Sequence, residues 1–174
     1  MGVSLACTAA VLASAQGARK VVDASMVLAA DGARADSTVK AAAVARISPG
    51  FHINDHHPSL DYLIPTELKL DSSPNITIER LVYPKGKLKT FVFSPDTPLS
   101  VYEGTLDVGV LLKVVTATSP GDYTLKGKFS YQACNDKACL PPTSVPVELS
   151  VKVVGSRAPV KAANSEIFSR IKFD

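Results

Sequence analysis

Long hydrophobic runs are the first thing this sequence lacks, since it holds no stretch of about eighteen consecutive apolar residues, the length typical of a membrane-spanning helix. Tryptophan is absent and aromatic residues make up only 6% of the chain, so a folded core must depend on Val, Leu and Ile. The formal net charge is only +3 and the basic residues are scattered, which argues against a nucleic-acid partner. No glycine-rich phosphate loop, paired-carboxylate pattern or Ser-His-Asp arrangement stands out, so no common nucleotide-binding or hydrolytic motif is present.

The 174 residues have a globular composition, 46% apolar and 20% charged, with room for one domain plus tails. Residues 1–15 have the features of an export leader, because a short apolar run ends in Ala13-Ser14-Ala15, the small-x-small pattern of a signal-peptidase site. Cys7 would leave with this leader. We therefore predict a periplasmic or otherwise exported protein, with a flexible lead-in over residues 16–37 and a folded domain over residues 38–154.

Alternation of apolar and polar residues with a period of two dominates the predicted domain, as in half-buried β-strands. The clearest strands are 106–114, 123–133 and 145–153, and shorter ones lie at 41–47, 67–70, 76–82 and 89–93. Turns rich in Pro and Gly separate them, and no helical pattern of about ten residues intervenes, as a parallel α/β sheet would need. The sequence thus predicts an all-β fold, an immunoglobulin-like antiparallel sandwich whose last two long strands form a hairpin. Residues 155–174 are predicted to be a linker or a short helix capped by Asn164 or Ser165.

Two of the three cysteines, Cys134 and Cys139, lie between the last two long strands. If the apolar positions of strand 123–133 face the core, Cys134 shares the outer face with the polar positions, so its sulfur is expected to be reachable. Facing residues of a hairpin have Cβ atoms ~4.5–5.5 Å apart, close enough for a disulfide after small adjustment. Such a bond differs from the core disulfide of antibody domains, which joins distant strands.

The residues alone leave three kinds of site open for this cysteine pair. It can be a structural staple in an exported protein, although closing a loop of about six residues contributes only roughly 2 kcal/mol, the low end for disulfides. It can be a reversible redox pair, which requires an accessible sulfur. A zinc site would need histidines from another part of the chain, namely His52, His56 and His57, and solvated loop histidines are the simpler interpretation.

Two separated motifs give the chain a resemblance to a known family. The first is Tyr-Gln-Ala-Cys-Asn-Asp-Lys-Ala-Cys-Leu-Pro-Pro at residues 131–142, followed by the strand at 145–153. The second is Pro-Gly-Phe-His-Ile-Asn at residues 49–54, followed by Leu-Ile-Pro-Thr-Glu-Leu at 63–68. Together they resemble the N-terminal periplasmic domain of the thiol:disulfide interchange protein DsbD, over roughly residues 38–154.

This resemblance implies a thiol carrier that acts as a component of a protein-disulfide reductase. In that family, the domain receives electrons from a thioredoxin-like module fed by a membrane-embedded donor domain, and passes them to thioredoxin-like periplasmic partners through mixed disulfides. Cys139 is then the cysteine that forms the mixed disulfide, and Cys134 is the one that resolves it. No cofactor, metal or nucleic acid is implied. Because the sequence has no Cys-x-x-Cys motif and no membrane span, we expect it to depend on partners for its electrons.

The resemblance also points to residues around the cysteines. The family shields its pair with a loop that bears an aromatic residue, and residues 90–98 are the corresponding segment here, with Phe91 or Phe93 as the cap. The alternative is that both phenylalanines are strand residues in the core. Tyr131, Asp136 and Lys137 form the immediate environment of the pair. Asp136 and Lys137 can bias the thiol pKa values in opposite directions, or can be ordinary solvated turn residues.

A second function class fits the same residues. An immunoglobulin-like binding or adaptor module can carry the same disulfide merely to fix a hairpin. Reversible reduction by a thioredoxin-like protein separates the two hypotheses.

Overall fold

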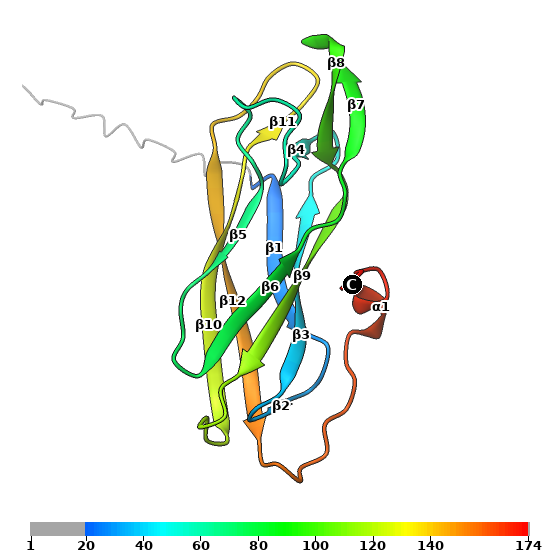
Figure 1. Ribbon diagram of the computed structural model, residues 1–174. Coiled ribbons are helices and arrows are strands. Elements are labelled where there is room, and N and C mark those ends of the chain that lie inside the picture. The colour runs from blue at the N-terminus through cyan, green and yellow to red at the C-terminus, as the bar shows by residue number, and fades with distance from the viewer. Residues whose placement is uncertain (1–19, 174) are drawn as a thin grey trace, which may run out of the picture.

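Twelve β-strands and one short helix lie within residues 20–173, the part of the chain that the computed structural model describes (Figure 1). The strands are β1 (Val22–Leu28), β2 (Ala33–Arg34), β3 (Thr38–Ile47), β4 (His52–Asn54), β5 (Glu67–Leu70), β6 (Ile76–Val82), β7 (Lys87–Phe91), β8 (Ser94–Tyr102), β9 (Thr105–Val114), β10 (Gly121–Tyr131), β11 (Ala133–Cys134) and β12 (Thr143–Val154), and the helix is α1 (Ser165–Phe168). The leader predicted over residues 1–15, with Cys7, lies outside the described residues.

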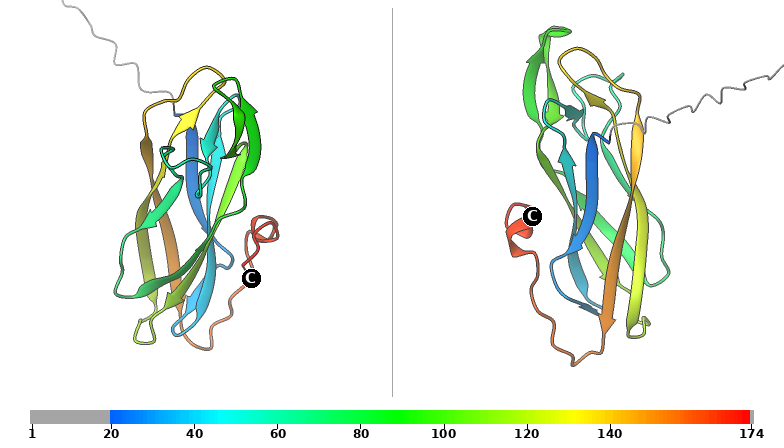
Figure 2. Two further views of the ribbon diagram at one scale, coloured as in Figure 1. Left: turned by 45° about the horizontal axis from the view of Figure 1, so that its top comes forward. Right: turned by 180° about the vertical axis from the view of Figure 1, so that it is seen from behind.

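Two four-stranded sheets face each other as a sandwich, which confirms the predicted all-β, immunoglobulin-like class (Figures 1 and 2). One sheet has the order β1-β3-β9-β6 and the other β2-β12-β10-β5. Their pairings are antiparallel except for the short β2–β12 contact. The predicted hairpin is also confirmed, since β10 and β12 pair from Gly121↔Val153 to Tyr131↔Thr143.

The alternation read from the sequence produces the core between these sheets. In β12 the odd positions from Val147 to Val153 are buried while the even ones are exposed, and β10 buries Leu125, Phe129 and Tyr131 in the same way. Gly127 continues that face without a side chain, because a Cβ there would lie 2.4 Å from the backbone oxygen of Lys69. The missing side chain lets β5 pair closely with β10.

The flexible lead-in predicted over residues 16–37 is wrong from Val21 onward. β1 pairs along its whole length with β3, from Val22↔Ile47 to Leu28↔Ala41. Val21, Val22 and Leu28 belong to the main core, and Ala33 of β2 joins them. The prediction missed β1 because its alternation is brief, with Val22, Ala24 and Met26 against Asp23 and Ser25, in a segment otherwise rich in Ala, Asp and Arg. The folded domain therefore begins before residue 38.

A third four-stranded sheet, with the order β11-β4-β8-β7, lies at one end of the sandwich (Figure 1). The strand predicted at 89–93 is β7, which ends two residues earlier, and the chain turns at Val92-Phe93 into β8. We call this sheet, with the flanking loops 55–66 and 135–142, the cysteine end, and the two larger sheets the sandwich body. The cysteine end has a small apolar cluster of its own, built on Phe91, Leu99 and Val101.

The segment after β12 returns along the β1-β3-β9-β6 sheet and contains the predicted short helix (Figure 2). Asn164 is its N-cap residue, and the Asn164 side chain donates a hydrogen bond to the backbone oxygen of Leu28. Beyond α1, Arg170 pairs with Asp107 at 2.8 Å, and Ile171 packs over Gly109, where a Cβ would lie 2.7 Å away. Within the described residues, no helix has the length and apolarity needed to cross a membrane.

Candidate redox site

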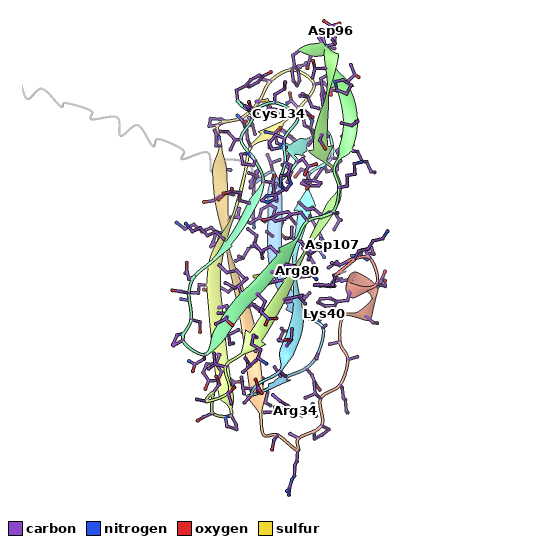
Figure 3. The ribbon with its side chains drawn as sticks, viewed as in Figure 1. Arg34, Lys40, Arg80, Asp96, Asp107 and Cys134 are labelled. Carbon is purple, nitrogen blue, oxygen red and sulfur yellow. A yellow bond between two sulfur atoms is a disulfide. The ribbon has the colours of Figure 1, made fainter. Side chains whose placement is uncertain are left out.

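The cysteines lie on a small hairpin between β10 and β12, and Figure 3 shows Cys134 at the cysteine end of the molecule. Cys134 and Cys139 form a disulfide. Two backbone hydrogen bonds close the hairpin around it, from the Asn135 amide to the Ala138 oxygen at 3.0 Å and from the Leu140 amide to the Ala133 oxygen at 2.8 Å. The disulfide thus lies across one short turn and joins no distant strands, as the spacing of the cysteines predicts.

Asn135 organises this turn, and the sequence reasoning missed it. The Asn135 Oδ1 atom accepts hydrogen bonds from the backbone amides of Lys137 and Ala138, both at 2.9 Å. This is an Asx turn, a conformation that Asn forms readily because its short side chain reaches the backbone two residues on. The position of Asn135, directly after Cys134 and before two charged residues, could have indicated an Asx turn. Asp136 and Lys137 themselves are exposed turn residues.

The two cysteines differ in exposure, and the prediction that Cys134 is reachable was wrong. Cys134 is only 2% exposed, whereas Cys139 is exposed. Strand parity failed because β10 ends at Tyr131, so that Ala133 and Cys134 belong to β11 of the third sheet and are both buried. Because β11 pairs with β4, the alternation of buried and exposed residues along β10 does not continue to Cys134. Cys139 is consequently the more accessible of the two cysteines.

Cys134 is paired with a histidine from a distant part of the chain. β11 and β4 are antiparallel, with Ala133 opposite Ile53 and Cys134 opposite His52. Directly opposed residues of such a pair present their side chains on the same face of the sheet. His52 is 3% exposed and stacks on Phe91, with ring centroids 4.2 Å apart. The sequence reasoning considered His52 only as a zinc ligand or a solvated residue.

The two predicted cap residues continue this stack. Phe91 is buried and its ring lies 5.2 Å from that of Phe93, which is 48% exposed. The rings of His52, Phe91 and Phe93 therefore stack in a row, from the residue opposite Cys134 to the turn between β7 and β8. Phe91 also belongs to the small cluster with Leu99 and Val101, so it packs as a core residue as well.

Charged groups around His52 act in both directions on its pKa. Burial lowers the pKa of His52 most strongly, and the charge of Lys89 lowers it further. The charges of Glu103 and Asp136 raise it, but the net effect is a pKa below the ordinary value. Lys89 is itself paired with Glu103 at 2.6 Å and lies 5.9 Å from the centre of the Phe91 ring. The imidazole is consequently neutral at pH 7.

Tyr131, the last residue of β10, lines an apolar cavity of about 490 Å³. Burial raises the pKa of the Tyr131 hydroxyl, while a hydrogen bond with the Val22 backbone acts in the opposite direction. Apolar and proline side chains line the cavity: Val21, Phe51, Tyr131, Ala133, Leu140, Pro141, Pro142 and Thr143. Leu140 directly follows Cys139 and is 39% exposed, so the reachable sulfur is bordered by apolar surface.

The other two histidines take no part in the cysteine site. His56 stacks on Tyr83, with ring centroids 3.7 Å apart, and the Nδ1 atom of His56 lies 2.9 Å from the Thr66 carbonyl oxygen. His57 is exposed. Among residues 20–173, no group of three or more His, Cys, Asp and Glu side chains has a metal-binding arrangement.

Comparison with known proteins identifies similar chains. Residues 22–150 match the sequence profile of the family described as "Thiol:disulfide interchange protein DsbD, N-terminal". The match begins with β1, in agreement with the earlier start of the domain. A search of curated protein sequences finds no match.

Solved structures of low sequence identity are also similar. The N-terminal periplasmic domain of ScsB from Proteus mirabilis is 15% identical with a TM-score of 0.48, and the alignment covers 74% of this chain but 44% of that one. The reduced DsbD N-terminal domain of Neisseria meningitidis is 19% identical with a TM-score of 0.40, and the alignment covers 79% of this chain and 90% of that one. A complex between the DsbD and PilB N-terminal domains from the same organism gives 18% identity, a TM-score of 0.40, and coverage of 71% and 80%.

Proposed function

This chain belongs to the family of the N-terminal domain of the thiol:disulfide interchange protein DsbD, and we propose from that premise that it is an exported thiol:disulfide exchange domain. The observation that carries the proposal is the asymmetry of the disulfide, which joins an exposed Cys139 to a buried Cys134. Exchange proceeds by attack of a thiolate on a disulfide sulfur, so one sulfur must be reachable and the other must stay close behind it. The hairpin supplies both conditions.

The exchange reaction uses the two cysteines in sequence. In the reduced domain, the Cys139 thiolate attacks a disulfide of an oxidised partner, forming a mixed disulfide and releasing one partner thiolate. The Cys134 thiolate then attacks the Cys139 sulfur, restores the Cys134–Cys139 disulfide and releases the second partner thiolate. Two electrons and two protons pass from the domain to the partner. The reverse sequence reloads the domain from a reduced donor.

The partners that suit this chemistry are proteins with an exposed redox-active cysteine pair. We assign as acceptors thioredoxin-like periplasmic proteins, and as the source of electrons a membrane-embedded donor domain acting through a thioredoxin-like module. A complex of a DsbD N-terminal domain with a PilB N-terminal domain supports protein partners. The periplasmic location of the ScsB domain supports a periplasmic location for this chain.

The β7–β8 hairpin is proposed as the cap of the site. Its tip carries Val92 and Phe93, which are exposed, and its base carries Phe91, which stacks on His52. The charged cap residues are Lys89 and its partner Glu103, which lie on the same hairpin and just after it. Asp136 and Lys137 are proposed as surface charges that a partner meets beside Cys139.

Trapping of the mixed disulfide tests the proposed function. Purified Cys134→Ala protein is mixed with an oxidised thioredoxin-like periplasmic protein, and we expect a covalent complex that a reductant cleaves. The matched Cys139→Ala variant, which keeps only the buried cysteine, is expected to trap little or none. If neither variant is trapped and the native disulfide resists a thioredoxin-like reductant while the fold stays intact, the disulfide is a structural staple and the chain is a binding module.

A further inference from the structure

The resolving step poses a chemical problem that the position of Cys134 creates. Only the thiolate attacks a disulfide, and burial in apolar surroundings disfavours the thiolate of any cysteine. Cys134 is 2% exposed, so water has little access to its sulfur. Once Cys139 is bonded to a partner, a Cys134 thiol must lose its proton inside the protein before it can react.

One titratable side chain is placed directly opposite this thiol. The β4–β11 pairing sets His52 against Cys134, and cross-strand neighbours of this kind have Cβ atoms about 4.5–5.5 Å apart. The ring of His52 is held in place by Phe91, which stacks on it at 4.2 Å. Within the described residues, no hydrogen bond joins the His52 ring to another protein group. The imidazole is therefore oriented yet has a nitrogen available.

The surroundings keep this imidazole in the form that accepts a proton. Lys89 on β7 and Glu103 after β8 face it from the cap side, and Asp136 faces it from the cysteine hairpin. Burial outweighs the two carboxylates, so the pKa of His52 is lowered and the ring is neutral near pH 7. The same carboxylates limit the cost of a transient positive charge on the ring.

We propose that His52 is the proton acceptor for Cys134 in the resolving step, an inference that rests on the proposed exchange function. The Cys134 thiol gives its proton to the imidazole, and the resulting thiolate attacks the Cys139 sulfur of the mixed disulfide. The Cys134–Cys139 bond forms as the bond from Cys139 to the partner breaks. The departing partner thiolate then takes the proton from the imidazolium, directly or through water, and His52 is neutral again.

A two-phase kinetic experiment tests this role. Reduced protein is mixed with a limiting amount of dithiobis(nitrobenzoate), a small disulfide whose thiolate product is coloured. The first coloured thiolate reports attack by Cys139, and the second reports attack by Cys134 on the mixed disulfide. In His52→Phe, which keeps an aromatic ring against Phe91, the first phase should be unchanged. The second phase should slow by about 100-fold at pH 7, which is the lower end of the rate enhancement expected from a positioned general base.

The pH profile separates proton transfer from packing. As the pH rises well above about 8.5, the ordinary pKa of a thiol, the second phase of His52→Phe should approach the wild-type rate, because burial shifts thiolate formation to higher pH. His52→Gln, which is closer in size to His, should show the same profile. His57→Phe makes the identical change at an exposed histidine of the same segment and should leave both phases unchanged.

The outcomes distinguish the inference from the function on which it rests. A second phase that is insensitive to His52, or that is slowed equally at every pH, overturns the role of His52 as proton acceptor and leaves the exchange function standing. Failure of Cys134→Ala to trap a thioredoxin-like protein overturns the exchange function itself, whatever the rates with dithiobis(nitrobenzoate) are. A slowed second phase that recovers at high pH, in variants with native thermal stability, supports the proposal.

Discussion

The sandwich body and the cysteine end of this molecule are built on different physical principles. The body buries almost only apolar side chains, from strands with regular alternation. Among residues 20–173, five polar or charged residues are buried, and four of them, His52, Asn54, Asp55 and Thr66, lie on or beside β4 at the cysteine end, whereas the fifth is Thr118. The body thus obtains its stability from apolar burial, while the cysteine end adds buried hydrogen bonds and aromatic stacking to a small apolar cluster.

Asp55 shows how the cysteine end is held together. The Asp55 carboxylate accepts hydrogen bonds from the Ser100 hydroxyl at 2.6 Å, the Tyr102 hydroxyl at 2.5 Å and the Gly86 amide at 3.1 Å. It thereby ties the end of β4 to β8 and to the loop before β7. Burial raises the pKa of Asp55, but these hydrogen bonds together lower it below the ordinary value. The buried charge fixes the sheet that positions His52 and the cap.

Damage to the body should be global, and the largest effect is expected for Phe129→Ala. Phe129 is fully buried between the sheets, so its removal should cost about 3–5 kcal/mol of unfolding free energy. Denaturant unfolding measures this loss. A loss of unfolding free energy below about 1 kcal/mol would contradict the contrast between the two regions, because the body would then not depend on its apolar core. Molecules that remain folded should show unaltered disulfide reactivity.

Damage to the polar network should be next in size and should depend on pH. Asp55→Ala leaves several buried donors without their acceptor and should cost about 3 kcal/mol, whereas Asp55→Asn keeps one acceptor oxygen and should cost less. Because the folded-state pKa of Asp55 is lowered, its stabilisation is present above the unfolded-state pKa and is lost as pH falls through the folded value. Unfolding curves below about pH 4 should therefore lose stability less steeply in Asp55→Ala than in the wild type.

Opening the disulfide should have a smaller effect on the fold. The loop of about six residues that it closes should contribute only roughly 2 kcal/mol. The double variant Cys134→Ala/Cys139→Ala should remain folded, and its circular dichroism spectrum should match that of the wild type. Global unfolding of this variant would show that the cysteine end is needed for the stability of the body, which contradicts the division between the two regions.

The smallest change in stability, with a distinct change in reactivity, is expected for Phe93→Ala. Phe93 is 48% exposed at the tip of the cap, so the unfolding free energy should change by less than about 1 kcal/mol. If the hairpin shields the disulfide, reduction by a small thiol should become several-fold faster. Val92→Ala alters the neighbouring residue at the same tip, 90% exposed, and should leave the reduction rate unchanged. Equal rates of disulfide reduction in the wild type, Phe93→Ala and Val92→Ala would show that Phe93 does not shield the disulfide.

The body was predictable because each of its strands carries its own signal. Val145 to Val153 alternate with polar residues, and that pattern alone indicates a strand with one buried face. The prediction failed at β1, where the alternation is only five residues long, and at Cys134, where one strand ends and a strand of another sheet begins. Local periodicity predicts which face of a continuous strand is buried, but it cannot predict a change of sheet.

The sequence by itself determined the all-β class, the β10–β12 hairpin and the short turn that brings Cys134 and Cys139 within bonding distance. These features depend on neighbours in the chain, whose distances are limited by covalent geometry. Only the tertiary structure decided which sulfur is buried and that His52 lies opposite Cys134. Pairing between β4 and β11 joins residues far apart in the chain, and its register is set by the packing of the third sheet as a whole.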